Sequence, residues 1–537
     1  MLDSFMKKPE PSSEPDSIEL RNRSSDTASY QEPKNPGSWK TVPIILGLLL
    51  SNFCLGLDNT IIATANPHIA AQFNSFDDVG WYGSAYFLTT CAVSLLYGKL
   101  YALYPVKWVY LAALFLFELG SLICGVTPSS VGLIIGRAIA GLGSGGLVSG
   151  AILVMYGSTP KEKRPMFTGI LSGAYNIASI AGPLVGGAFT DKVSWRWCFY
   201  INLPCGLITS IFLLFVPSSP PLVQAKGLRA KVYKLDVLGN ILFLGMVVSL
   251  LLALQSGGDE YPWNDARVIA PFVVSGILLL IFIANTKWQQ ENATIPLRLI
   301  KTRSIWGTAL FAFCIAGAFF VFSYYLPIWF QVVKGASAIK SGLMNLPLIL
   351  SSVITSVLTG LLVTYIGWFN PFLLACSVIL TIGSGAMTML GVHSGSNCWI
   401  GYQVIVGIGY GLGQHLPFVV ASSYLSPTDV PMGTVIMSFV QFLSGAVFIA
   451  VGEAVFQVQL LSSVRSRTPE VDPGTLLAAG ITKLRQQVSG DTLDLLLLCV
   501  NDAVVHIFYI AVALSGLSLV GAIFVKWKSI KHQGSPE

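Results

Sequence analysis

Long apolar runs separated by short polar segments make up most of the chain after Trp39. A helix needs about 20 apolar residues to cross about 30 Å of hydrocarbon, and fourteen runs meet that length. They lie near 43–66, 80–102, 107–126, 131–156, 166–189, 198–216, 236–255, 267–285, 305–327, 342–365, 370–391, 399–421, 432–455 and 504–525. Backbone groups left unpaired in lipid are costly, and the alternation of barrel strands is absent. The pattern predicts an all-α polytopic membrane protein with 14 transmembrane helices.

The composition agrees with that class and excludes others. Apolar residues make up 53% of the 537 residues and charged residues 11%, whereas soluble domains carry about 25% charged residues. An ordinary soluble enzyme and a fully disordered chain are therefore excluded. Residues 1–40 are polar and lack the apolar stretch of a signal peptide, so we predict a disordered cytoplasmic tail. The net charge of +6 does not indicate nucleic acid, because membrane proteins concentrate Lys and Arg in cytoplasmic loops.

The distribution of Lys and Arg predicts the topology. An even number of spans places both ends on one side, and 22 of the 32 basic residues then fall on that side, against nine opposite. We therefore predict that both tails, including 526–537, and the basic linker 217–235 are cytoplasmic. Residues 456–503 form a long outer loop, which we expect to fold over the outer mouth. The sequons at Asn22 and Asn292 fall inside, so neither is expected to be glycosylated.

The chain also contains signs of two similar halves. Gly98 ends span 2 and Gly360 ends span 10, and each is followed by a short inner turn. If these sites correspond, residues 41–216 and 304–525 are two six-helix halves, and 236–285 is an inserted helix pair. Repeated halves are typical of secondary transporters.

The nine cysteines include no CxxC pair, and most lie in apolar runs. They are interpreted as small buried hydrophobic residues. Cys398 and Cys499 are both expected near the outer face, which leaves a disulfide between them open.

Four charged residues lie inside predicted spans, where a charge costs at least a few kcal/mol. They are Asp58, Glu118, Arg137 and Glu453. Arg137 is deep enough that its side chain cannot easily reach the interface. Each residue is either functional or paired structurally with a neighbouring helix, and the sequence leaves this open. Four polar residues, Tyr86, Asn176, Gln414 and Gln441, are candidates for contacts with a substrate in a central cavity or for ordinary interhelical hydrogen bonds.

Motifs for catalysis are absent. The sequence contains no GxxxxGK[ST], HExxH or GxSxG and no cluster of metal ligands, so we predict neither an enzyme nor a protein driven by ATP, and no metal or cofactor. Glycine strings in spans 4, 5 and 12 indicate close helix packing.

Several strings resemble motifs of the major facilitator superfamily, in particular its 14-spanning drug:proton antiporters and fungal mycotoxin efflux pumps. Leu57-Asp58-Asn59-Thr60-Ile61 resembles their span-1 signature, and Arg137 to Gly143 their span-4 motif. Gly182-Pro183-Leu184-Val185-Gly186-Gly187 resembles the antiporter motif of span 5. Trp81 to Tyr86 and Ser194 to Pro204 resemble fungal members. The inner-gate loop departs from the family's GxLxDRxGR pattern, because it keeps Gly98 and a basic residue, Lys107, but no acid.

The resemblance implies a proton-coupled exporter that works by alternating access on a small amphiphilic organic compound, such as a toxin, secondary metabolite or drug. Asp58, Glu118, Arg137 and Glu453 are then the candidates for proton coupling, and the proton gradient is the only energy source. We expect a monomer in the plasma membrane, with a vacuolar or vesicle membrane as the alternative. Uptake of a siderophore or a basic amino acid on the same scaffold and a non-transporting receptor or sensor are the rival functions.

Overall fold

The computed structural model describes residues 38–75, 78–216, 220–223, 227–257, 261–468 and 490–531. Within these ranges the chain is helical, and its only β pairing consists of two isolated bridges. The predicted all-α class is therefore confirmed. Asn22, nearly all of the predicted tail 1–40 and residues 532–537 lie outside the described residues.

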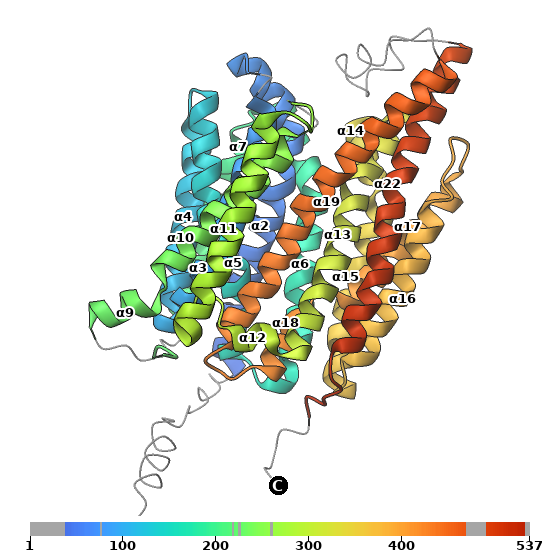
Figure 1. Cartoon of the computed structure of the whole chain (residues 1–537). Coiled ribbons are helices and arrows are strands. Elements are labelled where there is room, and N and C mark those ends of the chain that lie inside the picture. The colour runs from blue at the N-terminus through green and yellow to red at the C-terminus, as the bar shows by residue number, and fades with distance from the viewer. Residues whose placement is uncertain are drawn as a thin grey trace, which may run out of the picture.

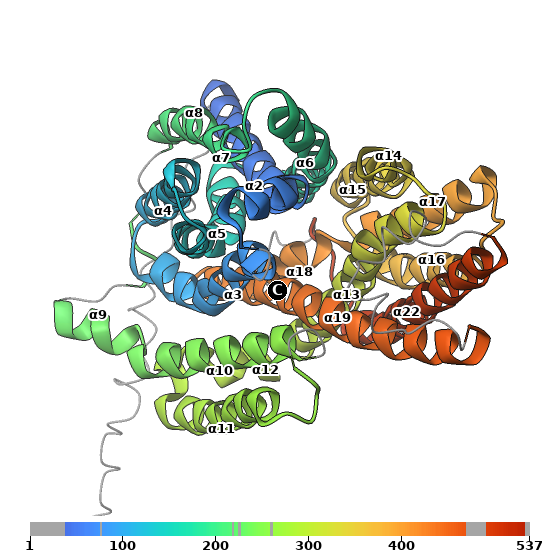
Figure 2. The same cartoon turned by 90° about the horizontal axis from the view of Figure 1, so that it is seen from above.

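The first half of the chain folds into one bundle (Figures 1 and 2). Its helices are α2 (Ser38–Phe73), α3 (Val79–Leu103), α4 (Val106–Val126), α5 (Ser130–Ser158), α6 (Arg164–Lys192), α7 (Trp197–Tyr200) and α8 (Asn202–Leu214), with a 3-10 turn, η2 (Lys161–Lys163). The linker contains α9 (Leu228–Lys234). The inserted pair is α10 (Val237–Ser256) and α11 (Ala266–Gln289), followed by η3 (Gln290–Asn292) and α12 (Leu297–Lys301).

The second half forms the other bundle. Its helices are α13 (Arg303–Val332), α14 (Ala338–Met344), α15 (Leu346–Ile366), α16 (Asn370–Met387), α17 (Ser396–Gly413), α18 (Leu416–Tyr424), α19 (Val430–Arg467) and α22 (Asp491–Phe524). Each half has its own hydrophobic core, and residues of α10 and α19 join the core of the first half. The inserted pair lies beside the two bundles, next to α3 and α19 (Figure 2).

Thirteen segments of the described residues are long and apolar enough to cross a membrane. The remaining predicted span, 166–189, coincides with α6, a 29-residue helix that packs between α2 and α15. Helix α6 carries polar and glycine residues along most of its length, which lowers its hydropathy. Helices α9 and α12 lie at one end of the bundle, and α7 and α14 at the other (Figure 1), in the order that the predicted topology requires.

The outer segment 456–503 differs from the expected loop. Helix α19 continues to Arg467 and α22 already begins at Asp491, while residues 469–489 lie outside the described residues. Leu460 and Leu497 are buried between the two extensions, and Arg467 pairs with Asp502 at 2.6 Å. The apolar stretch Leu495–Leu498 is therefore part of a packed helix, α22, whereas the stretch 476–479 lies outside the described residues.

The two halves meet at one end of the molecule. Ser356 of α15 donates to the Gly169 carbonyl of α6 (3.4 Å). At the α3–α19 contact, a Cβ built on Gly98 would lie 2.9 Å from the Met432 side chain. Both contacts lie toward the end of the bundle that holds α12, the end that the predicted topology places in the cytoplasm, so the two halves are in contact there.

The structure answers the question that the sequence left open for Cys398 and Cys499. Cys398 and Cys499 both carry free thiols, Cys398 exposed at the start of α17 and Cys499 buried in α22. Because α22 begins before Cys499, this residue is packed in the hydrophobic core of the second half. No disulfide joins it to Cys398.

Candidate functional site

A buried ion pair lies inside the first half. Arg137 of α5 donates through Nη1 to Asp58 Oδ2 of α2 at 2.6 Å, and both residues are 1% exposed. Arg137 Nε also donates to the Tyr82 carbonyl of α3 (2.9 Å), and the guanidinium lies 4.3 Å from the centre of the Tyr86 ring. Two of the four charged candidates are therefore direct partners.

An amide completes the surroundings of Asp58. Asn202, at the start of α8, donates to Asp58 Oδ1 and to Ser121 Oγ of α4, each at 3.1 Å. Asp58 thus contacts groups from α5 and α8 at once. Arg137 Nη2 has no hydrogen-bond partner among the described residues. A pair in which one donor is still free can rearrange without breaking every bond of the cluster.

Glycines in span 4 allow α5 to lie this close to its neighbours. A Cβ on Gly141 would lie 2.3 Å from the Tyr86 carbonyl, and one on Gly143 would lie 2.4 Å from the Ala113 carbonyl. Real side chains cannot occupy such positions without displacing the backbone. The glycine string therefore places Arg137 deep in the bundle, where Asp58 is its one ion-pair partner among the described residues.

Glu118 of α4 lies near the same cluster. Both of its carboxylate oxygens are buried and have no hydrogen-bond partner among the described residues, and they press against Gly206 of α8, where a Cβ would come within 2.0 Å of Oε1. An ionised carboxylate there would have neither water nor a donor. Glu118 is thus a second proton-coupling candidate in the same half.

Glu453 is separate from this cluster. It lies in α19 of the other half, where the Tyr325 hydroxyl lies 3.5 Å from one of its oxygens and Gln457 donates to the other (3.3 Å). The structure therefore gathers three of the four charged candidates in the first half and leaves Glu453 outside the group.

The antiporter-like string lies on α6 and has two different faces. Cβ atoms on Gly182 and Gly186 would lie 2.0 and 2.4 Å from hydroxyls of α2, so these two glycines allow α2 and α6 to pack closely. A Cβ on Gly187 would have its nearest neighbour 3.9 Å away, on α14. Pro183 lies inside α6. Only part of the string thus belongs to the tight α2–α6 contact.

Polar side chains connect the ion pair to the second half. Asn59, next to Asp58 on α2, donates to the Tyr175 hydroxyl of α6 (2.9 Å). The following residue, Asn176, donates to Gln414 Oε1, just beyond α17 (3.0 Å). Gln441 of α19 donates to the Gln414 carbonyl (3.1 Å). Three of the four predicted cavity residues therefore meet where the halves contact each other, and Tyr86 lies instead beneath Arg137.

Two amide atoms at this crossing are unused. Gln414 Nε2 and Asn59 Oδ1 are buried and have no hydrogen-bond partner among the described residues. Nearby, the rings of Phe319 and Tyr410 stack with centres 3.9 Å apart. One free donor, one free acceptor and a flat aromatic surface are therefore present between the halves.

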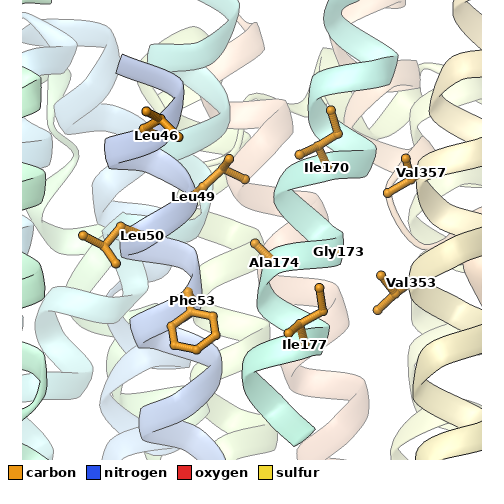
Figure 3. A pocket seen from close by; sticks show the side chains of 10 residues that line it. All are labelled: Leu46, Leu49, Leu50, Phe53, Ile170, Gly173, Ala174, Ile177, Val353 and Val357. Carbon is orange, nitrogen blue, oxygen red and sulfur yellow. The ribbon is translucent and has the colours of Figure 1, made fainter. Parts of the chain in front are cut away.

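An apolar pocket of about 450 Å³ adjoins the crossing. It lies between α2, α6 and α15, and its lining includes Phe53, Ala174, Ile177 and Val353 (Figure 3). Ala174 and Ile177 flank the polar pair Tyr175 and Asn176 along α6. Polar and apolar surfaces thus lie side by side on one helix.

Lys107, the basic residue of the predicted inner-gate loop, is placed within the first half. Its ammonium donates to the Leu214 and Val216 carbonyls (both 2.9 Å), at the end of α8, whereas Gly98 lies at the α3–α19 contact.

Sequence reasoning did not select Asn202, Tyr175 or Lys99. Asn202 and Tyr175 are polar residues within apolar runs, and that signal was available.

Two helical bundles and a charged pair buried among membrane-spanning helices are typical of secondary transporters. The sequence profile of the Major Facilitator Superfamily matches residues 48–449. The chain belongs to this superfamily.

Transporters of fungi are among the relatives that are similar to this chain along most of its length. The MFS-type transporter astH of Aspergillus oryzae is 51% identical over 92% of this chain and 88% of its own length. The efflux pump aunC of Aspergillus niger is 50% identical over 93% of this chain and 95% of its own length. The efflux pump roqT of Penicillium rubens is 50% identical over 92% of each chain. The resemblance to fungal efflux transporters is thereby confirmed.

Solved structures share the fold at low identity. The proton:xylose symporter XylE has a TM-score of 0.60 with 13% identity, covering 92% of this chain and 98% of its own. The human organic anion transporter MFSD10 has a TM-score of 0.55 with 14% identity, and the match covers 92% of this chain and 100% of MFSD10. The superfamily, the efflux-pump relatives and the thirteen apolar segments together show that the protein is a multi-pass membrane transporter.

Proposed function

We propose that the protein exports a small amphiphilic organic compound from the cytoplasm in exchange for protons. The observation that carries this proposal is the buried Asp58–Arg137 pair. Its neighbour on α2, Asn59, donates to Tyr175 of α6, and the next residue of α6, Asn176, donates to Gln414 of the second half. The relatives named efflux pumps support the direction of transport. The cargo class is a toxin, a secondary metabolite or a drug.

Asp58 is the proposed proton carrier. A proton that enters from the outer side binds an oxygen of Asp58 and removes its negative charge, so the bond to Arg137 Nη1 loses its ionic component. Arg137 keeps its own charge at any physiological pH and is still held at the Tyr82 carbonyl. When the site faces inward, the proton leaves and the ion pair forms again. The two states of the pair therefore differ by one proton.

The coupling to substrate follows from adjacent residues. Asp58 and Asn59 are neighbours on α2, as Tyr175 and Asn176 are on α6, so a shift of α2 at the ion pair changes the contact between Asn176 and Gln414. A substrate that replaces this contact can use the free Gln414 donor and the free Asn59 acceptor. The Phe319–Tyr410 stack and the apolar pocket suit a compound with an aromatic or aliphatic part.

The charges support an uncharged or weakly charged cargo. Asp58 and Arg137 neutralise each other, and the groups at the crossing are amides, hydroxyls and rings. We propose that the transporter acts as a monomer in the plasma membrane, without catalysis and with no cofactor beyond the proton gradient.

Deletion of the gene followed by metabolite profiling of cells and medium tests the direction and identifies the cargo. Export predicts that one compound accumulates in the cells and disappears from the medium. An uptake transporter gives the reverse distribution, and a receptor changes neither. Re-expression of the wild-type chain and of Asp58→Asn provides the matched control, since only the former should restore release.

A further inference from the structure

The inner ends of α3 and α19 belong to different halves and must separate whenever the transporter opens inward. They touch at Gly98 and Met432. The family's pattern places an acid in the loop that follows Gly98, but residues 98–107 contain none. Something else must hold these ends together.

The inserted pair lies along this contact. Helix α10 packs against both α3 and α19, and its Phe243 ring lies 5.0 Å from the Phe439 ring of α19. The chain then returns beneath α3 as η3 and α12 before it enters α13 of the second half. The inserted pair thus brings a polar segment, residues 290–298, to the inner end of both halves.

Lys99 of α3 points at this segment. Its ammonium donates to the Asn292 carbonyl at 3.1 Å, and the residue is only 9% exposed. Three acids are held at this segment: Glu291 belongs to it, Asp236 accepts from Thr294, and Asp429 accepts from Arg298. A lysine this buried requires such partners, and all three come from outside the first half.

Two anchors hold the segment in place. Asp236, in the left-handed conformation (φ 47°) before α10, accepts from the Thr294 amide (2.6 Å), the Thr294 hydroxyl (2.9 Å) and the Gly239 amide (3.0 Å). Arg298 of α12 binds both oxygens of Asp429, just before α19, at 2.8 and 2.9 Å, and Glu291 at 2.7 Å. The segment is therefore fixed to the inserted pair and to the second half, while Lys99 joins it to the first.

We propose that Lys99 is the positioning residue that keeps the inner gate closed, by docking on the segment 290–298 that follows the inserted pair, beside Asp236, Glu291 and Asp429. This inference rests on the proposed alternating-access cycle. The polarity is reversed relative to the pattern that the family resemblance implies, since the cation lies on α3 and the acids lie opposite. Arg298 does not take the place of Lys99, because each of its three nitrogens already donates to Asp429 or Glu291 and holds the side chain there. The inserted helices thereby acquire a role in gating.

The test measures the distance between the inner ends of the halves directly. Glu162→Cys, beside α6, and Tyr365→Cys, at the end of α15, are exposed positions at the α6–α15 contact, away from Lys99. Spin labels at both sites, on purified full-length protein in lipid nanodiscs, report the ratio of open to closed inner gates by electron-electron double resonance.

We expect Lys99→Gln to raise the open-to-closed ratio on the order of tenfold, the equivalent of one lost charge-assisted hydrogen bond. Lys99→Arg should restore the wild-type ratio. Lys301→Gln removes the same charge from an exposed site on α12 and should leave the ratio unchanged. Asp429→Asn keeps the shape of the side chain and removes its charge, so it should also raise the ratio. This variant replaces Lys99→Gln in the test if Lys99→Gln does not fold.

The outcomes separate this inference from the function beneath it. A wild type that opens and closes between pH 5.5 and pH 8, with an unchanged ratio in both Lys99→Gln and Asp429→Asn, overturns the assignment of Lys99 and leaves the transport cycle standing. A wild type that shows one distance at every pH overturns the cycle as well.

Discussion

Replacement of Arg137 distinguishes a transport role from a structural one. Arg137→Ala leaves the Asp58 carboxylate buried, with Asn202 as its remaining donor. Breaking a buried pair by removing one partner typically costs about 3–5 kcal/mol. We therefore expect less folded protein and no proton-driven efflux in the molecules that do fold.

Two further variants divide that effect. Arg137→Lys keeps the charge but cannot reach both Asp58 and the Tyr82 carbonyl with a planar group, so one hydrogen bond to a charged group is lost, worth about 1.5–3 kcal/mol. This variant should fold and transport poorly. The double variant Asp58→Asn with Arg137→Gln removes both charges, and its stability should recover most of the loss, because no unpaired charge remains.

The assay is efflux of the cargo found by metabolite profiling, measured in cells across an imposed pH gradient and divided by the amount of folded transporter at the surface. Thermal unfolding of the purified variants gives the stability series. Our reasoning is refuted if Arg137→Ala retains normal efflux per folded molecule, since Arg137 would then be a packing residue only. A double variant as unstable as Arg137→Ala would refute the assigned pairing.

Three other changes follow from the geometry. Gly186→Leu forces a side chain into α2 and should cost about 1–3 kcal/mol and block efflux, whereas Gly187→Leu, on the open face of the same helix, should transport normally; equal losses in transport assays would show that the face of α6 is irrelevant. Glu118→Gln should shift the pH optimum of efflux without abolishing it, because Asp58 keeps its partner, and complete loss would make Glu118 the carrier. A thiol-reactive, membrane-impermeant label should reach Ser466→Cys in intact cells and Lys301→Cys only after permeabilisation, and the reverse pattern would invert the topology.

The helices were predictable because run length and backbone chemistry leave few alternatives in a membrane. The ends of the helices were not predictable. Helices α19 and α22 continue beyond the predicted spans. The extensions contain polar residues such as Gln457 and Asp494, and this polarity suggested a loop. The packing of Leu460 against the other extension determined the outcome, and that contact joins distant parts of the chain.

The candidate site was predictable in residue type but not in pairing. Arg137 had three acids as potential partners, and the choice of Asp58 depends on how α2, α4 and α5 are rotated about their axes, which no local pattern specifies. Gly187 was expected to act like Gly186, yet a neighbouring glycine on a helix faces a different direction. Lys99 was counted only as one inner positive charge, because its hydrogen-bond partner, the Asn292 carbonyl, lies 193 residues further along the chain.

Proton exchange at Asp58 is most directly tested in proteoliposomes that contain purified wild-type or Asp58→Asn protein and the identified cargo. Two modes are compared, cargo movement driven by a pH gradient and exchange of labelled for unlabelled cargo without a gradient. The account predicts that Asp58→Asn keeps the exchange and loses the gradient-driven movement, since the neutral amide mimics the protonated carboxyl but cannot release a proton. Gradient-driven movement at the wild-type rate in Asp58→Asn would contradict it.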